Sequence, residues 1–142
     1  MPSNPWLVLA GALSATASLV HLAIIVGGAP WYRFFGAGER MAQLAEARSL
    51  RPTLITLGIA TVLAAWAAYA FAGAGLIARL PLMRPALVAI SAVYLLRGVA
   101  PVPVLMATRG RVTSFWIWSS LIVLAFGIVY AVGTWRAWPE LG

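Results

Sequence analysis

The sequence predicts an all-α fold, a four-helix transmembrane bundle with a short interfacial helix in the first loop. Of the 142 residues, 63% are hydrophobic and only 9% are charged, whereas soluble domains are about half apolar. Four stretches reach the roughly 20 apolar residues that a spanning helix needs, and only the first connection between them is long. We therefore expect residues 1–142 to form a single transmembrane domain.

The first predicted span covers residues 5–28. Pro5 suits the start of a helix, where its missing N–H costs little. Ser14, Ser18 and His21 share one helical face, so this polar seam should point toward other helices. No basic residue precedes the apolar run, so we expect the span to be retained rather than cleaved as a signal peptide.

The first loop carries side chains that suit a membrane surface. Residues 31–35, Trp-Tyr-Arg-Phe-Phe, place Arg33 among aromatic rings that favour the headgroup level. Residues 39–48 are predicted as an amphipathic helix. Glu39 at its first position is also favoured by the helix dipole alone.

The second predicted span covers residues 52–78 and contains an alanine ladder at four-residue spacing. Its members are Ala60, Ala64, Ala68 and Ala72. Small residues let membrane helices approach closely. The ladder therefore predicts a helix contact, either within the bundle or between the protomers of a homo-oligomer.

The third predicted span, residues 85–106, contains Arg97 well inside it. An arginine at the centre of a spanning helix costs roughly 2.5 to 3.5 kcal/mol on insertion scales, so it normally faces a partner, a cavity or a ligand. Ser91, Tyr94 and Arg97 recur on one face of this helix. Pro101 removes the N–H that would bond the carbonyl of Arg97, so we expect a kink after the arginine.

The fourth predicted span covers residues 112–135, with aromatic side chains at both ends, as membrane interfaces favour. Four spans put both termini on one side. The other side carries six of the ten basic residues: Arg33, Arg40, Arg48, Arg51, Arg109 and Arg111. The positive-inside rule then places the long first loop in the cytoplasm and the termini in the periplasm. Arginines at span ends predict membrane lipids as partners and no nucleic acid.

Polar groups gather in the half of the bundle toward the first loop, among them Thr53, Thr56, Ser119 and Ser120, which predicts a ligand site. With a rise of about 1.5 Å per residue, His21 and Arg97 lie roughly 10 and 13 Å from that end of their spans. We expect His21, Tyr94 and Arg97 to line a cavity, with Arg33 and Glu39 on the loop above it. The alternatives to a ligand site are structural roles. In these, Arg97 pairs with Glu39 or with free carbonyls, and His21 and Tyr94 are packing residues.

Several kinds of chemistry lack the residues that they need. The chain has no cysteine and no aspartate, one histidine and three glutamates. This composition excludes disulfides and Ser-His-Asp triads and is a poor supply of metal ligands. We predict no catalytic residue, no metal site and no cofactor.

Three segments carry a resemblance that covers nearly the whole chain. They are residues 21–42, residues 92–98 with Arg97, and Trp138 to Glu140. They resemble a group of small four-span bacterial inner-membrane proteins, and the span number and size also resemble DoxX-type four-helix membrane proteins. The resemblance implies the architecture and a bacterial inner membrane, and no particular activity.

These observations favour a non-enzymatic membrane protein that binds a lipid or a small amphipathic anion through Arg97. A transporter or channel subunit with a hinge at Pro101 and Pro103 is a second hypothesis. An assembly protein that oligomerises through the alanine ladder is a third. An enzyme that acts on a lipid headgroup or an isoprenoid is a fourth.

Overall fold

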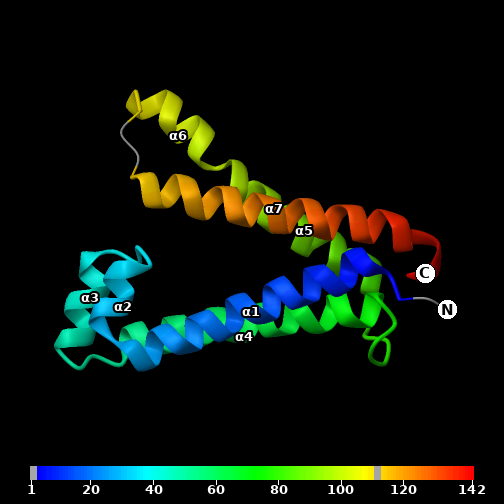
Figure 1. Cartoon of the computed structure of the whole chain (residues 1–142), viewed down its shortest axis with the longest axis horizontal. Coiled ribbons are helices and arrows are strands. Elements are labelled where there is room, and N and C mark those ends of the chain that lie inside the picture. The colour runs from blue at the N-terminus through cyan, green and yellow to red at the C-terminus, as the bar shows by residue number, and fades with distance from the viewer. Residues whose placement is uncertain (1–2, 111–112) are drawn as a thin grey trace. The chain divides into compact units, whose positions relative to one another are not determined.

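The computed structural model describes residues 3–110 and 113–142, and every regular element in these ranges is a helix (Figure 1). Arg111, counted above for orientation, and Val112, where the fourth span is predicted to begin, lie outside the described residues. The chain forms two compact units. We call Met1–Leu13 with Trp66–Gly142 the terminal unit, and Ser14–Ala65 the loop unit.

Four helical segments of the described residues are long and apolar enough to cross a membrane. They are α1 (Pro5–Gly27), α4 (Arg51–Gly73), α5 (Met83–Val99) continued by α6 (Pro101–Thr108), and α7 (Ser114–Ala137) continued by η1 (Trp138–Glu140). Each exceeds the roughly 20 residues that a bilayer requires. The predicted fold class is confirmed, and the chain is a multi-pass membrane protein.

The second span is shorter than predicted because α4 ends at Gly73. Gly75 has a φ of 81°. Its N–H bonds the carbonyl of Ala72 at 3.1 Å, and the N–H of Leu76 bonds that of Phe71 at 2.9 Å. These two bonds form a Schellman ending, which stops a helix at a residue in the left-handed conformation. Residues 74–78, predicted as helix, belong to the connection before α5.

The third span is interrupted where the sequence predicts a kink. Helix α5 ends at Val99 and α6 begins at Pro101, because the proline has no N–H with which to continue the helical hydrogen bonds. Figure 1 shows the chain change direction between the two helices. Arg97 therefore lies in the last turn of α5, beside the break.

In the terminal unit, α5 packs closely against α7. A Cβ atom on Gly98 of α5 would lie only 2.6 Å from the Cα of Leu124 on α7. A Cβ atom on Gly127 of α7 would lie 2.9 Å from the backbone nitrogen of Leu95 on α5. Each of these glycines thus lies against a leucine of the other helix. The missing side chains let the two backbones come into contact.

Asn4 joins the start of α1 to α7 within the terminal unit. Its Oδ1 accepts hydrogen bonds from the N–H groups of Trp6 at 3.0 Å and Leu7 at 3.4 Å. This arrangement is an N-cap. Its Nδ2 donates to the carbonyl of Gly133 at 3.0 Å, so one side chain both caps α1 and binds α7.

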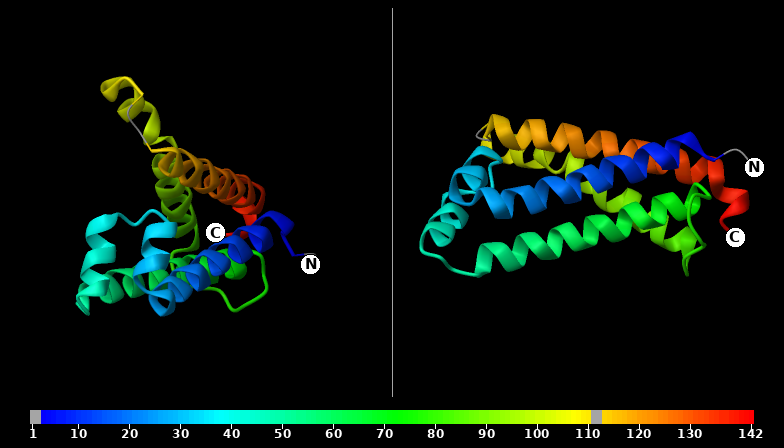
Figure 2. Two further views of the ribbon diagram at one scale, coloured as in Figure 1. Left: turned by 60° about the vertical axis from the view of Figure 1, so that its left-hand side comes forward. Right: turned by 60° about the horizontal axis from the view of Figure 1, so that its bottom comes forward.

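In the loop unit, α2 (Ala29–Phe34) and α3 (Glu39–Glu46) pack against each other. Figure 2 shows them side by side in light blue and cyan. Helix α3 is the predicted amphipathic helix and ends two residues earlier than expected. Tyr32 is buried, and its hydroxyl lies 3.0 Å from that of Thr56 on α4. This contact fixes α2 against a spanning helix.

The polar seam and the alanine ladder differ in their burial. Ser14 and Ser18 are buried, and the hydroxyl of Ser18 donates to the carbonyl of Ala60 at 2.7 Å, so these two members of the seam face protein as predicted, whereas His21 is only partly buried. Of the ladder, Ala60 and Ala72 are buried whereas Ala64 is exposed. The ladder is therefore not one continuous buried face, and the homo-oligomer stays a prediction.

Candidate functional site

Arg97 is half-buried and reaches from α5 to α7 inside the terminal unit. Its Nη1 donates to Oγ of Ser120, which is 1% exposed, and its Nη2 donates to Oγ of Ser119 at 3.4 Å. The guanidinium carbon lies 5.9 Å from the centre of the Trp116 ring. All of these partners are electrically neutral. The sequence analysis predicts that both serines lie in the same half of the bundle as Arg97. It predicts Trp116 only as one of the aromatic residues at a membrane interface.

The position of Arg97 along its span makes this charge costly. At a rise of about 1.5 Å per residue it lies roughly 16 Å from the Thr108 end of the segment Met83–Thr108. The negative end of the α5 dipole offsets part of the charge, since Arg97 is in the last turn. Neutral hydroxyls and a helix end still leave a net positive charge at depth in the span.

None of the glutamates is a partner of Arg97 among the described residues. Its three glutamates are Glu39, Glu46 and Glu140, and Glu39 and Glu46 both bind Arg33. Glu140 belongs to η1, beyond the end of α7, about 30 Å along the helix axis from Ser120. Among the described residues, no ion pair involves Arg97.

Tyr94 lies one turn before Arg97 on α5 and is buried among aromatic rings. Its ring centre lies 4.9 Å from that of Trp66, 5.7 Å from that of Phe126 and 5.3 Å from that of Tyr130. The hydroxyl of Tyr130 donates to the carbonyl of Trp66 at 3.1 Å. These four rings join α4, α5 and α7 within the terminal unit, which supports the packing reading of Tyr94.

His21 belongs to the loop unit, whereas Tyr94 and Arg97 belong to the terminal unit. Its Nδ1 lies 2.7 Å from the carbonyl oxygen of Ala17, one turn earlier on α1. Since a carbonyl oxygen only accepts, Nδ1 carries the proton, and a neutral ring then leaves Nε2 as an acceptor. The cavity that His21 is predicted to share with Arg97 stays a prediction.

Arg33 joins α2 to α3 through two ion pairs, which we call the Arg33 network. Its Nη2 lies 2.8 Å from Oε1 of Glu39, and its Nη1 lies 2.6 Å from Oε1 of Glu46. Its Nε also donates to Oε2 of Glu39 at 3.1 Å. Two of the predicted site residues, Arg33 and Glu39, are thus partners of each other, and the Glu39 carboxylate proposed as a partner of Arg97 is bound to Arg33.

The hydrogen bonds of the Arg33 network shift the pKa values of its members. The bond from Arg33 lowers the pKa of Glu39 below its ordinary value, and the bonds to Glu39 and Glu46 raise the pKa of Arg33. A carboxyl with a lower pKa in the folded state stabilises the fold above its unfolded pKa. That stabilisation is lost as the pH falls through the folded pKa.

Acidification from about pH 7 to about pH 3 should therefore loosen the α2–α3 hairpin. Amide hydrogen exchange across residues 29–46, corrected for its intrinsic pH dependence, should become faster by a small factor, because exposed ion pairs contribute little stability. The double variant Glu39→Gln, Glu46→Gln should exchange fast at both pH values. Equal acid sensitivity of wild type and double variant would show that other groups hold the hairpin.

Comparisons of the chain with protein families, curated proteins and solved structures found no match. The resemblance to DoxX-type proteins accordingly stays a prediction.

Proposed function

We propose that this multi-pass protein resides in a bacterial inner membrane and binds the anionic group of a lipid or a small amphiphile through Arg97. The observation that carries the proposal is a half-buried guanidinium, deep in a spanning segment, whose partners are the neutral hydroxyls of Ser119 and Ser120. A charge within a membrane usually meets a compensating group. Since no carboxylate pairs with Arg97 among the described residues, an anionic ligand is the natural complement.

The serines leave Arg97 ready for such a ligand. A guanidinium has five N–H groups in a planar fork that matches phosphate and carboxylate oxygens. In Arg97, two of these groups donate to the serines of α7. Ser119 also donates to the carbonyl of Trp116 at 3.0 Å, which fixes the orientation of its oxygen. The remaining N–H groups of Arg97 are available to an anion without breaking these bonds.

The α2–α3 hairpin would lie at the membrane surface beside the headgroups. Trp31 and Phe34 of α2 are exposed, Phe34 to 76%, and rings of this kind favour the interface. Arg48 is exposed just after α3 and suits anionic lipids. The positive-inside rule favours a cytoplasmic position for the hairpin and a periplasmic position for the termini.

The proposal is tested with the variants Arg97→Gln and Arg40→Gln, which lose the same charge. Each purified protein is titrated with phosphatidylglycerol in neutral detergent, and bound lipid and thermal stability are followed by native mass spectrometry and melting. Arg97→Gln should bind at least about tenfold more weakly, because a charge-assisted hydrogen bond is worth roughly 1.5 to 3 kcal/mol. Arg40→Gln should bind like the wild type.

The lipid-free proteins separate a binding role from a structural one. Without lipid, Arg97→Gln should melt at or above the wild-type temperature, since it removes a charge without a counter-ion from the span. A purely structural Arg97 predicts a lower melting temperature with and without lipid. If Arg97→Gln still responds to phosphatidylglycerol as Arg40→Gln does, the proposed role of Arg97 is wrong.

A transporter or channel subunit is a second candidate, favoured by the break between Val99 and Pro101. Breaks of this kind in spanning segments often accompany hinges and ion or substrate paths. Flux measurements in proteoliposomes distinguish this candidate from a binding protein, which would bind the lipid and show no flux.

A further inference from the structure

The guanidinium of Arg97 reaches along the span to the level of the break between α5 and α6. The two glycine–leucine contacts described above show that α5 and α7 run antiparallel, with Gly98 against Leu124. Ser120, which accepts a hydrogen bond from Arg97, precedes Leu124 by one helical turn, or about 6 Å. The guanidinium therefore lies about one turn beyond Gly98, where α6 begins at Pro101.

The break also leaves two backbone carbonyls without their regular helical partners. In a continuous helix, the carbonyl of each residue accepts the N–H of the residue four positions later. Pro101 and Pro103 have no N–H, so the carbonyls of Arg97 and Val99 lose these bonds. Helical carbonyls point toward the C-terminal end of their helix, which for α5 is the direction of the break. A cation and two hydrogen-bond acceptors thus meet at one level of the span.

Helix α6 presents an apolar surface at this level. Of its eight residues only Pro101 is buried, and Val102 and Met106 are exposed to 56% and 79%. Figure 1 shows α6 diverging from α7, on which it packs less closely than α5 does. In a membrane, apolar side chains with few protein neighbours face acyl chains. This surroundings favours an amphiphile as the ligand, with its apolar part along α6.

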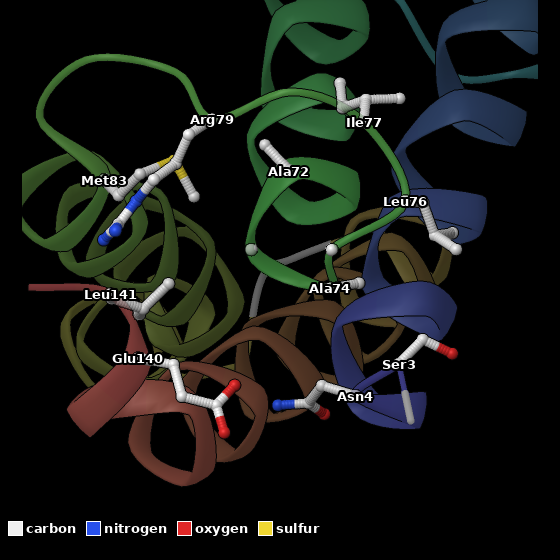
Figure 3. Close-up of a pocket in the computed structure, with 12 residues that line it drawn as sticks. Ser3, Asn4, Ala72, Ala74, Leu76, Ile77, Arg79, Met83, Glu140 and Leu141 are labelled. Carbon is white, nitrogen blue, oxygen red and sulfur yellow. The ribbon is translucent and has the colours of Figure 1, made fainter. Parts of the chain in front are cut away.

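The pocket at the opposite end of α5 is a less suitable place for an anion. This terminal pocket has a volume of about 640 Å³ and is lined by Arg79, Met83 and Glu140 among others (Figure 3). A carboxylate lines it as well as a cation, and Arg79 already donates to the carbonyl of Gly142 at 2.8 Å. Met83 lies roughly 20 Å along the helix axis from Arg97, so the terminal pocket and the break are separate places.

We propose that the ligand of Arg97 is an amphiphile whose anionic group has hydrogen-bond donors next to it, as the hydroxyl groups of a glycerol phosphate headgroup do. The anion accepts from the N–H groups of Arg97 that the serines leave available, and the hydroxyls donate to the carbonyls of Arg97 and Val99. This inference rests on the function proposed above and adds the polar chemistry of the ligand. An anion without donors would neutralise the cation but leave both acceptors unpaired in the span, which is costly.

The test compares two lipids with the same acyl chains and the same net charge. Phosphatidylglycerol has headgroup hydroxyls, and phosphatidylmethanol has none. The full-length protein in neutral detergent is titrated with each lipid, and native mass spectrometry gives the two affinities. The wild type should bind phosphatidylglycerol about fivefold more tightly, as expected for roughly one additional hydrogen bond. In Arg97→Gln both lipids should bind more weakly and the preference should vanish, which assigns it to the break rather than to the terminal pocket.

Proline variants test whether the two carbonyls are the acceptors. Pro101→Ala and Pro103→Ala restore the N–H groups that bond the carbonyls of Arg97 and Val99 in a continuous helix. Each should lower the preference for phosphatidylglycerol, and the double variant should abolish it while phosphatidylmethanol still binds. The matched control is Pro85→Ala in the first turn of α5, where N–H groups have no partner within the helix, so the wild-type preference should persist. Circular dichroism checks the fold of each variant.

Several results would overturn the inference without affecting the function proposed for Arg97. These are equal binding of the two lipids by the wild type, a full preference in the double proline variant, and a preference that persists in Arg97→Gln. Binding of glycerol 3-phosphate as tight as that of phosphatidylglycerol would exclude the need for an apolar part. The wild-type comparison requires no variant to fold. If Arg97→Gln binds both lipids like the wild type, the proposed function itself fails.

Discussion

Gly98→Ala is expected to destabilise the protein by about 1 to 3 kcal/mol, the usual cost of overpacking a closed contact. The added Cβ would lie 2.6 Å from both the Cα and the Cβ of Leu124 and 2.8 Å from its backbone nitrogen. Backbone atoms cannot turn away as a flexible side chain can. Helices α5 and α7 must therefore separate, and the melting temperature in detergent should fall. A larger residue, as in Gly98→Leu, should prevent the two helices from packing.

The matched control is Gly58→Ala. Gly58 lies inside α4, and a Cβ there would meet no atom within 4 Å apart from its chain neighbours and the nearby backbone of its own helix. The same substitution should therefore be neutral or slightly stabilising, since alanine is the better helix former by roughly 1 kcal/mol. Gly127→Ala should destabilise in the same way as Gly98→Ala because it faces Leu95. Equal melting temperatures for Gly98→Ala and Gly58→Ala would contradict the close approach of α5 and α7.

The sequence predicts the helices of this protein better than it predicts their contacts. Apolar runs and prolines place four spans and the kink, because these features act within one segment of chain. The alanine ladder of α4 predicts a contact either within the bundle or between protomers, and the exposed Ala64 leaves the contact between protomers a prediction. A close approach of helix backbones that the sequence does not indicate is found at Gly98 and Gly127. Which face of a helix meets a neighbour depends on its rotation, and spacing in an almost uniformly apolar helix does not determine that rotation.

The second predicted span, residues 52–78, runs past the end of α4 at Gly73. Residues 74–78 are as apolar as the residues before them, so hydropathy continues the span. The left-handed conformation of Gly75 and its Schellman bonds decide the end instead. Gly73 and Gly75 are a signal for such an ending, but glycine also occurs inside membrane helices.

The candidate site shows the same division between local and distant features. The sequence identifies Arg97 as costly in a membrane and places Ser119 and Ser120 in the same half of the bundle, and the structure joins them. Tyr94, on the same helical face, meets aromatic rings instead. Positions along a helix follow from counting residues, whereas the partner of each side chain depends on how neighbouring helices turn.

Tyr130→Ala is expected to cost about 3 to 5 kcal/mol, the range for removing a large buried aromatic side chain. Tyr130 is 0% exposed and is the largest of the fully buried side chains. Its ring contacts Tyr94, and its hydroxyl reaches the carbonyl of Trp66, so the loss affects α4, α5 and α7 together. In a membrane the helices persist when they separate, so the contribution of transfer from water is largely absent and the cost should lie near the lower end of this range.

Two variants divide this cost into its parts. Tyr130→Phe retains the ring and removes the hydrogen bond to Trp66, so it should cost only about 0.5 to 1.5 kcal/mol. Trp135→Ala removes an aromatic ring from the same helix, but Trp135 is 77% exposed, so its melting temperature in detergent should stay near that of the wild type. If Tyr130→Ala melted at the temperature of Trp135→Ala, the aromatic cluster would not hold the terminal unit together. If Tyr130→Phe cost as much as Tyr130→Ala, the hydroxyl rather than the ring would be the main support.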